Sequence, residues 1–148
     1  MTLRRSTIAF FIFGSLAAGS SVGLGAFGVH GLGQVMKYPA DAVRTFLDAT
    51  MFQADQGIAV LLVAVVCQLM ADGWPRRVMQ TSGVLLAASV LLFSGSVYSI
   101  TFGGFGGLAP VGGFSAMIGW LLFAVGAGLG LVKGDIRLPA GAQPHPAE

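Results

Sequence analysis

The sequence predicts an all-α membrane protein, an antiparallel bundle of four transmembrane helices. Hydrophobic residues make up 55% of the 148-residue chain and charged residues only 9%, whereas a soluble domain has about 25% charged residues. The mean hydropathy is +0.81. Two long segments, residues 6–36 and 78–132, contain no charged residue. Because one crossing needs about 20 mainly apolar residues, the first segment has room for one span and the second for two.

The same composition excludes several classes of protein. The net charge of +2 comes from too few charged residues to indicate nucleic-acid binding, so membrane lipids are the expected surroundings. The single cysteine, Cys67, cannot form an internal disulfide. Because most residues are needed for the spans, we expect one domain over residues 1–137 without a separate catalytic module.

The first span is predicted over about residues 7–29, directly after Arg4 and Arg5. This start could also be a secretory signal peptide, with LAAGS as a small-residue cleavage site. However, the apolar stretch continues through VGLGAFGV, which favours a retained helix. A polar connection that contains Pro39 follows this span.

The second span is predicted over about residues 49–71, with an amphipathic segment leading into it. Charged residues recur on one helical stripe of this region, namely Asp41, Arg44, Asp48 and Asp55. The uncharged run after Asp55 is short for a crossing, so the span should begin near Ala49. We therefore expect Asp55 near the membrane interface.

The third and fourth spans are predicted over about residues 82–102 and 114–132. A turn with one tryptophan and two arginines, residues 72–77, precedes the third span. Six glycines and a proline lie between the two spans in residues 103–113, which predicts a turn or a short re-entrant piece. The Pro- and Ala-rich residues 138–148 predict a disordered cytoplasmic tail.

The lysines and arginines predict the orientation of the bundle. Four spans place both termini and the loop after the second span on one side of the membrane. That side carries six positive charges, Arg4, Arg5, Arg76, Arg77, Lys133 and Arg137, and the other carries two, Lys37 and Arg44. The positive-inside rule then predicts that both termini are cytoplasmic.

Several glycines match known motifs. Gly23, Gly25 and Gly28 spell G-x-G-x-x-G, which binds dinucleotides only between a strand and a helix. Here the motif lies inside an apolar span, so we interpret its glycines as helix-packing residues. Two G-x-x-x-G pairs, Gly19/Gly23 and Gly126/Gly130, indicate the same role, either within one bundle or between protomers.

No catalytic, metal or cofactor site is predicted. His30 is the only histidine near the membrane, and the segment around Ser94 lacks a recognisable nucleophile context, which disfavours a Ser–His dyad. One histidine and one cysteine in different spans do not make a metal or haem site. The segment ITFGGFGG has glycines out of phase with a potassium-channel filter and is interpreted as a turn.

The antiparallel arrangement brings several polar residues to the non-cytoplasmic half of the bundle, namely His30, Gln53, Asp55, Gln56, Ser94 and Tyr98. Each needs a hydrogen-bonding partner in a low-dielectric setting. We therefore expect a hydrogen-bonded cluster with His30, Gln53, Ser94 and Tyr98 at its centre. Such a cluster either fastens the helices together or binds a small polar ligand, a lipid headgroup or a proton.

Three segments together, GLGAFGVHGL, LFSGSVYSI and APVGGFSAMIGWLLFAVGA, resemble the "domain of unknown function 423" family. These are small four-span membrane proteins similar to transmembrane protein 256. Where the family pattern has Tyr-Gln-x-x-His, this chain has Phe52, Gln53 and Gln56, and thus no imidazole. The resemblance implies four spans, a retained first span and a bacterial inner membrane, but no established activity.

The sequence leaves two functions open. The glycine count of 23 and the lack of a charged interior favour a non-enzymatic protein that packs in the membrane, as a homo-oligomer or as an accessory subunit of other membrane proteins. The alternative is a small channel or carrier for a solute or a proton. Transport requires ionisable groups facing the bundle interior, for which only His30 and Asp55 qualify.

Overall fold

The computed structural model describes residues 4–136, and this part of the chain is helical, with one isolated β-bridge between Met70 and Ile136. The elements are α1 (Arg5–Ala26), η1 (Phe27–Val35), α2 (Ala40–Leu69), α3 (Trp74–Ser89), η2 (Val90–Ser94), α4 (Gly95–Thr101) and α5 (Ala109–Val132). The π-helical segments η1 and η2 continue their neighbouring α-helices without a break. The result is four continuous helices, each long and apolar enough to cross a membrane, which confirms the predicted fold class.

All four helices begin before the predicted spans, and the first also ends later. They cover residues 5–35, 40–69, 74–101 and 109–132. At 1.5 Å per residue α2 is about 45 Å long, whereas the hydrocarbon core is about 30 Å thick. The amphipathic segment is therefore the first part of α2 and continues the same helix. The predicted disordered tail, residues 138–148, lies outside the described residues.

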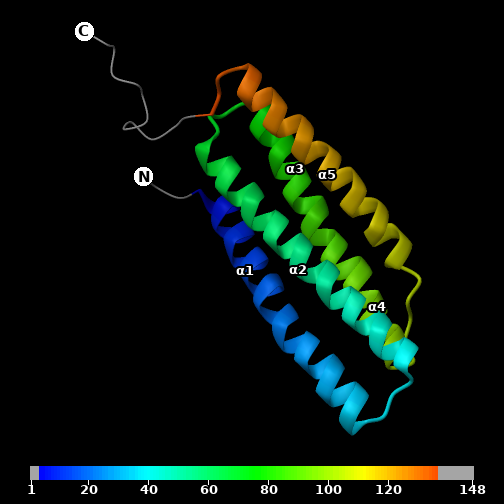
Figure 1. The fold of residues 1–148 in the computed structure, drawn as a ribbon. Helices are drawn as coiled ribbons and strands as arrows, with labels where there is room; N and C mark the ends of the chain where they lie inside the picture. The colour runs from blue at the N-terminus through cyan, green and yellow to red at the C-terminus, as the bar shows by residue number, and fades with distance from the viewer. Residues whose placement is uncertain (1–3, 137–148) are drawn as a thin grey trace.

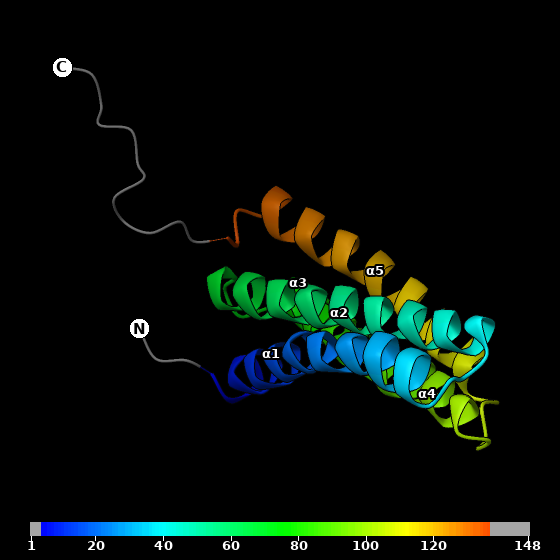
Figure 2. The ribbon, with the colours of Figure 1, turned by 60° about the horizontal axis from the view of Figure 1, so that its bottom comes forward.

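The helices form two hairpins that lie side by side. α1 packs mainly on α2, α5 packs mainly on α3, and the hairpins meet chiefly through α2 and α3. Figures 1 and 2 show α1 and α5 on opposite sides of this central pair. Two of the four helices thus have wide faces that no other part of the described chain covers.

Glycines decide how closely α1 and α2 approach. A Cβ atom added at Gly57 would lie 2.8 Å from the backbone nitrogen of Ala18, and one added at Gly14 would lie 2.8 Å from the carbonyl oxygen of Gly57. Only glycine lets two backbones come this near. This contact fixes the register of the first hairpin.

The apolar core lies in the half of the bundle nearer the turn between α2 and α3. It consists of side chains from α2 and α3 with Met70 between them, namely Ala59, Val60, Val63, Cys67, Met70, Met79 and Leu86. Phe10 and Phe13 of α1 and Phe123 of α5 pack against this core. In the opposite half, Phe46 is buried and packs against the rings of Phe27, Tyr98 and Phe102.

The beginning of α1, the α2–α3 turn and the end of α5 lie together at one end of the bundle (Figure 1). Arg4 forms an ion pair with Asp72 of the turn. The backbone N–H of Ala71 donates to the carbonyl oxygen of Asp135, at 2.8 Å. We call this end the basic end, because Arg4, Arg5, Arg76, Arg77 and Lys133 gather there.

Candidate functional site

Gln53, in the middle of α2, joins three helices. Its side-chain Nε2 donates to the carbonyl oxygen of Ala17 (2.9 Å) and to Oγ of Ser20 (2.8 Å), both on α1. Its Oε1 accepts a hydrogen bond from the hydroxyl of Tyr98 on α4, at 3.0 Å. Both N–H donors of the amide are therefore used, and the carbonyl of Ala17 can only accept, which fixes the orientation of the amide.

Ser94 completes this contact from η2. Its hydroxyl donates to the carbonyl oxygen of Ala49, at 2.9 Å, one turn before Gln53 on α2. Ser94 and Tyr98 are four residues apart and therefore share one face of the helix. We call Ser20, Gln53, Ser94 and Tyr98 the Gln53 cluster. Ser20 was not among the predicted residues, because hydropathy does not reveal the register of α1 against α2.

Gln56 lies near the Gln53 cluster but bonds to a different helix. Its Oε1 accepts from Nε1 of Trp120 on α5, at 3.2 Å. Gln56 is buried, with 6% of its surface exposed. Together the two glutamines connect α2 to α1, α4 and α5.

The structure corrects the prediction for His30. This residue lies in η1, its side chain is exposed, and its Nδ1 is 3.1 Å from Oε1 of Gln34 on the same helix turn. Gln53 meets the first helix at Ser20, and the helix axis from Ser20 to His30 is about 15 Å long before the helix continues to Val35. His30 is thereby carried past the level of Gln53.

Asp55 does not join the cluster either. It is exposed, and no hydrogen bond or salt bridge connects its carboxylate to any other described residue. It lies two positions after buried Gln53, and in an α-helix this spacing turns a side chain to nearly the opposite face. Asp55 therefore projects away from the bundle.

The packing glycines also divide into two groups. Gly126 and Gly130 are buried, and an added Cβ would lie 3.1 Å from the backbone nitrogen of Met79 and 2.8 Å from Cε of Met70, respectively. Gly19 and Gly23 are exposed, and among the described residues no heavy atom lies within 4 Å of an added Cβ. The expected close contact of Gly19 and Gly23 is therefore absent within this part of the chain.

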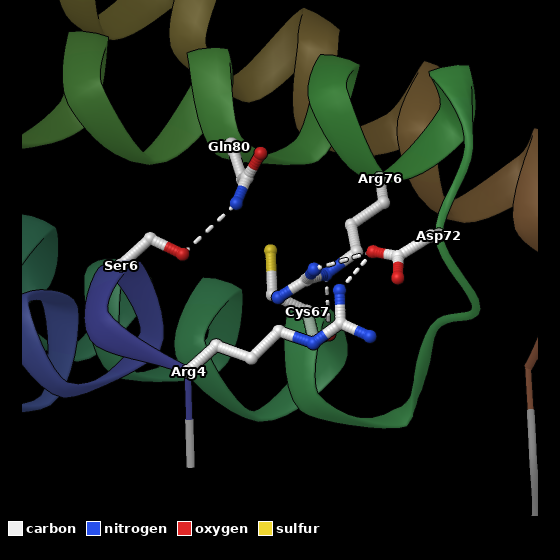
Figure 3. A network of polar contacts seen from close by, with 6 residues as sticks. All are labelled: Arg4, Ser6, Cys67, Asp72, Arg76 and Gln80. Carbon is white, nitrogen blue, oxygen red and sulfur yellow. Dashed lines mark hydrogen bonds and ion pairs between the residues drawn. The ribbon is translucent and has the colours of Figure 1, made fainter.

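A second polar network lies at the basic end (Figure 3). Arg76 is 5% exposed, and its Nε donates to the carbonyl oxygen of Cys67 at 2.9 Å, while its Nη1 is 3.0 Å from Oδ1 of Asp72. Asp72 also pairs with Arg4. Beside them, Nε2 of Gln80 donates to Oγ of Ser6 at 3.0 Å.

The position of Arg76 follows from how α2 ends. Carbonyls in the last turn of a helix lack donors from the next turn. The N–H of Ala71, four residues after Cys67, donates instead to Asp135. The guanidinium of Arg76 satisfies the carbonyl of Cys67 in its place. Sequence reasoning treated Arg76 only as a charge that sets topology.

The chemistry available to the Gln53 cluster is hydrogen bonding between neutral side chains, and that at the basic end is ion pairing of Arg4 and Arg76 with Asp72. Within residues 4–136 no three of the His, Cys, Asp and Glu side chains come together as a metal site would require. Gly23, Gly25 and Gly28 lie inside the helix formed by α1 and η1, without a preceding strand. Residues 102–108 form the turn between α4 and α5.

Comparison with known proteins gives the family. A family model described as "Protein of unknown function (DUF423)" matches residues 24–113 of this chain. The chain belongs to this family. The resemblance noted from the sequence is thus confirmed, and the matched range contains all six predicted polar residues, whereas Ser20 lies outside it.

Relatives in the DUF423 family are named membrane proteins. A UPF0382 membrane protein of Staphylococcus saprophyticus is 32% identical over 79% of this chain and 94% of its own length. The UPF0382 membrane protein YwdK of Bacillus subtilis is 31% identical over 80% of this chain and 94% of its own. The UPF0382 inner membrane protein YgdD of Escherichia coli is 35% identical over 78% of this chain and 86% of its own length.

No solved structure matches this chain. Family membership, the names of the relatives and the four apolar helices together show a four-span membrane protein.

Proposed function

We propose that this protein has no enzymatic role and acts as a packing partner in the membrane, as an accessory subunit of a larger complex or as a homo-oligomer. The observation that carries this proposal is the closed hydrogen bonding of the Gln53 cluster. Its amide, two serines and one tyrosine all bond to the chain itself. A substrate or ligand would have to break bonds that hold helices together.

The outward faces support the same proposal. Gly19 and Gly23 provide a flat surface on α1 that the described chain does not use. Small residues spaced by four let helices from two proteins approach closely in lipid. The partners of this protein would then be lipids and other membrane proteins or copies of itself.

Native mass spectrometry after purification in a mild detergent tests this proposal. We expect masses well above the 15.2 kDa of one chain, as multiples of it or as complexes with other subunits. A protein that stays a single chain in mild detergents and in lipid nanodiscs would contradict the proposal.

The second candidate is a small channel or carrier for a solute or a proton. Asp55 is an ionisable residue near the level of the Gln53 cluster, and because it faces outward, a pathway lined by it would run between two copies of the chain. Ionisable residues within transmembrane segments often mark such pathways. A solute- or pH-driven flux into liposomes containing the purified protein, lost in Asp55→Asn, would favour this candidate.

We further propose that the protein lies in a bacterial inner membrane with its basic end in the cytoplasm. Two observations support this: the six-to-two distribution of lysines and arginines, and the naming of the Escherichia coli relative as an inner membrane protein.

Alkaline phosphatase fused after Glu148 tests the orientation. This enzyme is active only in the periplasm, so we expect the fusion to be inactive, whereas a fusion in the connection near Tyr38 should be active. An active fusion at Glu148 would reverse the proposed orientation.

A further inference from the structure

Asp55 lies among exposed apolar side chains on the outward face of α2, and the charged residues Arg44 and Asp48 follow on the same face toward the Ala40 end. Met51, Ile58 and Leu62 are exposed at 66%, 52% and 46%, and they lie four, three and seven residues from Asp55, which places them on the same side of the helix. We call Met51, Asp55, Ile58 and Leu62 the Asp55 face. In a membrane protein, such a face meets lipid or another helix.

With the inner boundary of the hydrocarbon layer taken at the basic end, the helix lengths put Asp55 inside this layer, deeper than the interfacial position that the sequence predicts. From Leu69, at the basic end of α2, the helix axis to Asp55 is about 21 Å long, and the hydrocarbon core is about 30 Å thick. Trp120, which bonds to Gln56 next to Asp55, is about 20 Å along α5 from Lys133. Both estimates put Asp55 about 9 Å inside the non-cytoplasmic boundary of the hydrocarbon core. Its short side chain cannot reach the interface from there.

A carboxylate at that depth is unfavourable in lipid and is stabilised by an opposite charge. Within the described chain Asp55 has no such partner. A second copy in the same orientation cannot supply one at this level. The sequence places every basic residue near a helix end, at Arg4, Arg5, Lys37, Arg44, Arg76, Arg77, Lys133 and Arg137.

We propose that the Asp55 face docks a transmembrane helix of a different membrane protein, one that carries a lysine or arginine at the level of Asp55. The attraction between the two charges is strong, because the lipid around them has a low dielectric constant. Met51, Ile58 and Leu62 supply the apolar contacts around the pair. This inference rests on the proposed accessory role and gives the chemistry of the partner.

Synthetic transmembrane peptides of defined sequence test the charge pairing. The full-length protein and a leucine-rich peptide are labelled for energy transfer and reconstituted in phosphatidylcholine vesicles. The peptide carries one lysine about 9 Å inside one end of its apolar stretch, and the comparison peptide has leucine there. We expect the lysine peptide to bind at least about tenfold more tightly, which corresponds to about 1.4 kcal/mol.

Two variants locate the effect. Asp55→Asn should reduce binding of the lysine peptide to the level of the leucine peptide. Asp48→Asn removes a carboxylate that is also exposed on α2 but lies nearer its Ala40 end, and should leave the preference intact. Equal binding of the two peptides to the unaltered protein, or a preference that survives Asp55→Asn, would overturn the proposal.

The outcomes separate this inference from the proposed function. Without a lysine preference, oligomers or complexes in native mass spectra would leave the packing role standing and remove only the Asp55 pairing. Self-association that depends on Asp55 would also overturn the inference, because the partner would then be a second copy.

Discussion

Replacing Gly57 with leucine is expected to lower the free energy of unfolding of the protein by about 3 kcal/mol, at the upper end of the usual cost of overpacking. A Cβ atom at this position would lie 2.8 Å from the backbone nitrogen of Ala18 and 3.1 Å from Cβ of Ala17. The first of these atoms is backbone and cannot rotate away. The hairpin of α1 and α2 must therefore open, and this also separates Gln53 from Ala17 and Ser20.

Thermal or denaturant unfolding in a fixed detergent measures this effect. Gly128→Leu on α5 is the control, because it introduces the same side chain where no described heavy atom lies within 4 Å of the added Cβ. Its stability should remain within about 0.5 kcal/mol of the unaltered protein, as for other surface substitutions. Equal losses for Gly57→Leu and Gly128→Leu would show that the two helices do not meet at Gly57.

Replacing Gln53 with leucine is expected to destabilise the protein by about 2 kcal/mol. The variant leaves Ser20 and Tyr98 without the side-chain partner that joins them across helices. Hydrogen bonds between membrane helices contribute about 0.6 kcal/mol each on average and at most about 1.7. Three bonds of this kind converge on Gln53, so their sum is a large part of the stability of a small protein.

A double-mutant cycle with Tyr98→Phe isolates one of these bonds. We expect a coupling energy of about 0.6 to 1.7 kcal/mol between the two positions. His30→Ala should change stability little, because its side chain is exposed and bonds only to Gln34. A larger loss of stability for His30→Ala than for Gln53→Leu would show instead that His30 lies at the centre of the polar cluster, as the sequence predicts.

The structure brings together some of the residues that the sequence predicts for a polar cluster. Gln53, Ser94 and Tyr98 lie on one contact between α2 and the continuous helix of η2 and α4. Gln56 lies beside it and bonds to α5. His30 does not join this contact, because the register of α1 on α2 puts Ser20, ten residues before His30, at the level of Gln53. Hydropathy predicts the helix but not this register.

The sequence by itself determined how many helices cross the membrane and which ends carry the positive charges. Both follow from the cost of placing charged groups in hydrocarbon, which each residue incurs wherever its neighbours lie. Which polar groups meet was decided only by the tertiary structure. Gln53 faces the interior and Asp55 faces outward because Gly14 and Gly57 let α1 pack on one particular side of α2. The rotation of a helix about its own axis depends on such contacts between backbones, and no property of the single helix fixes it.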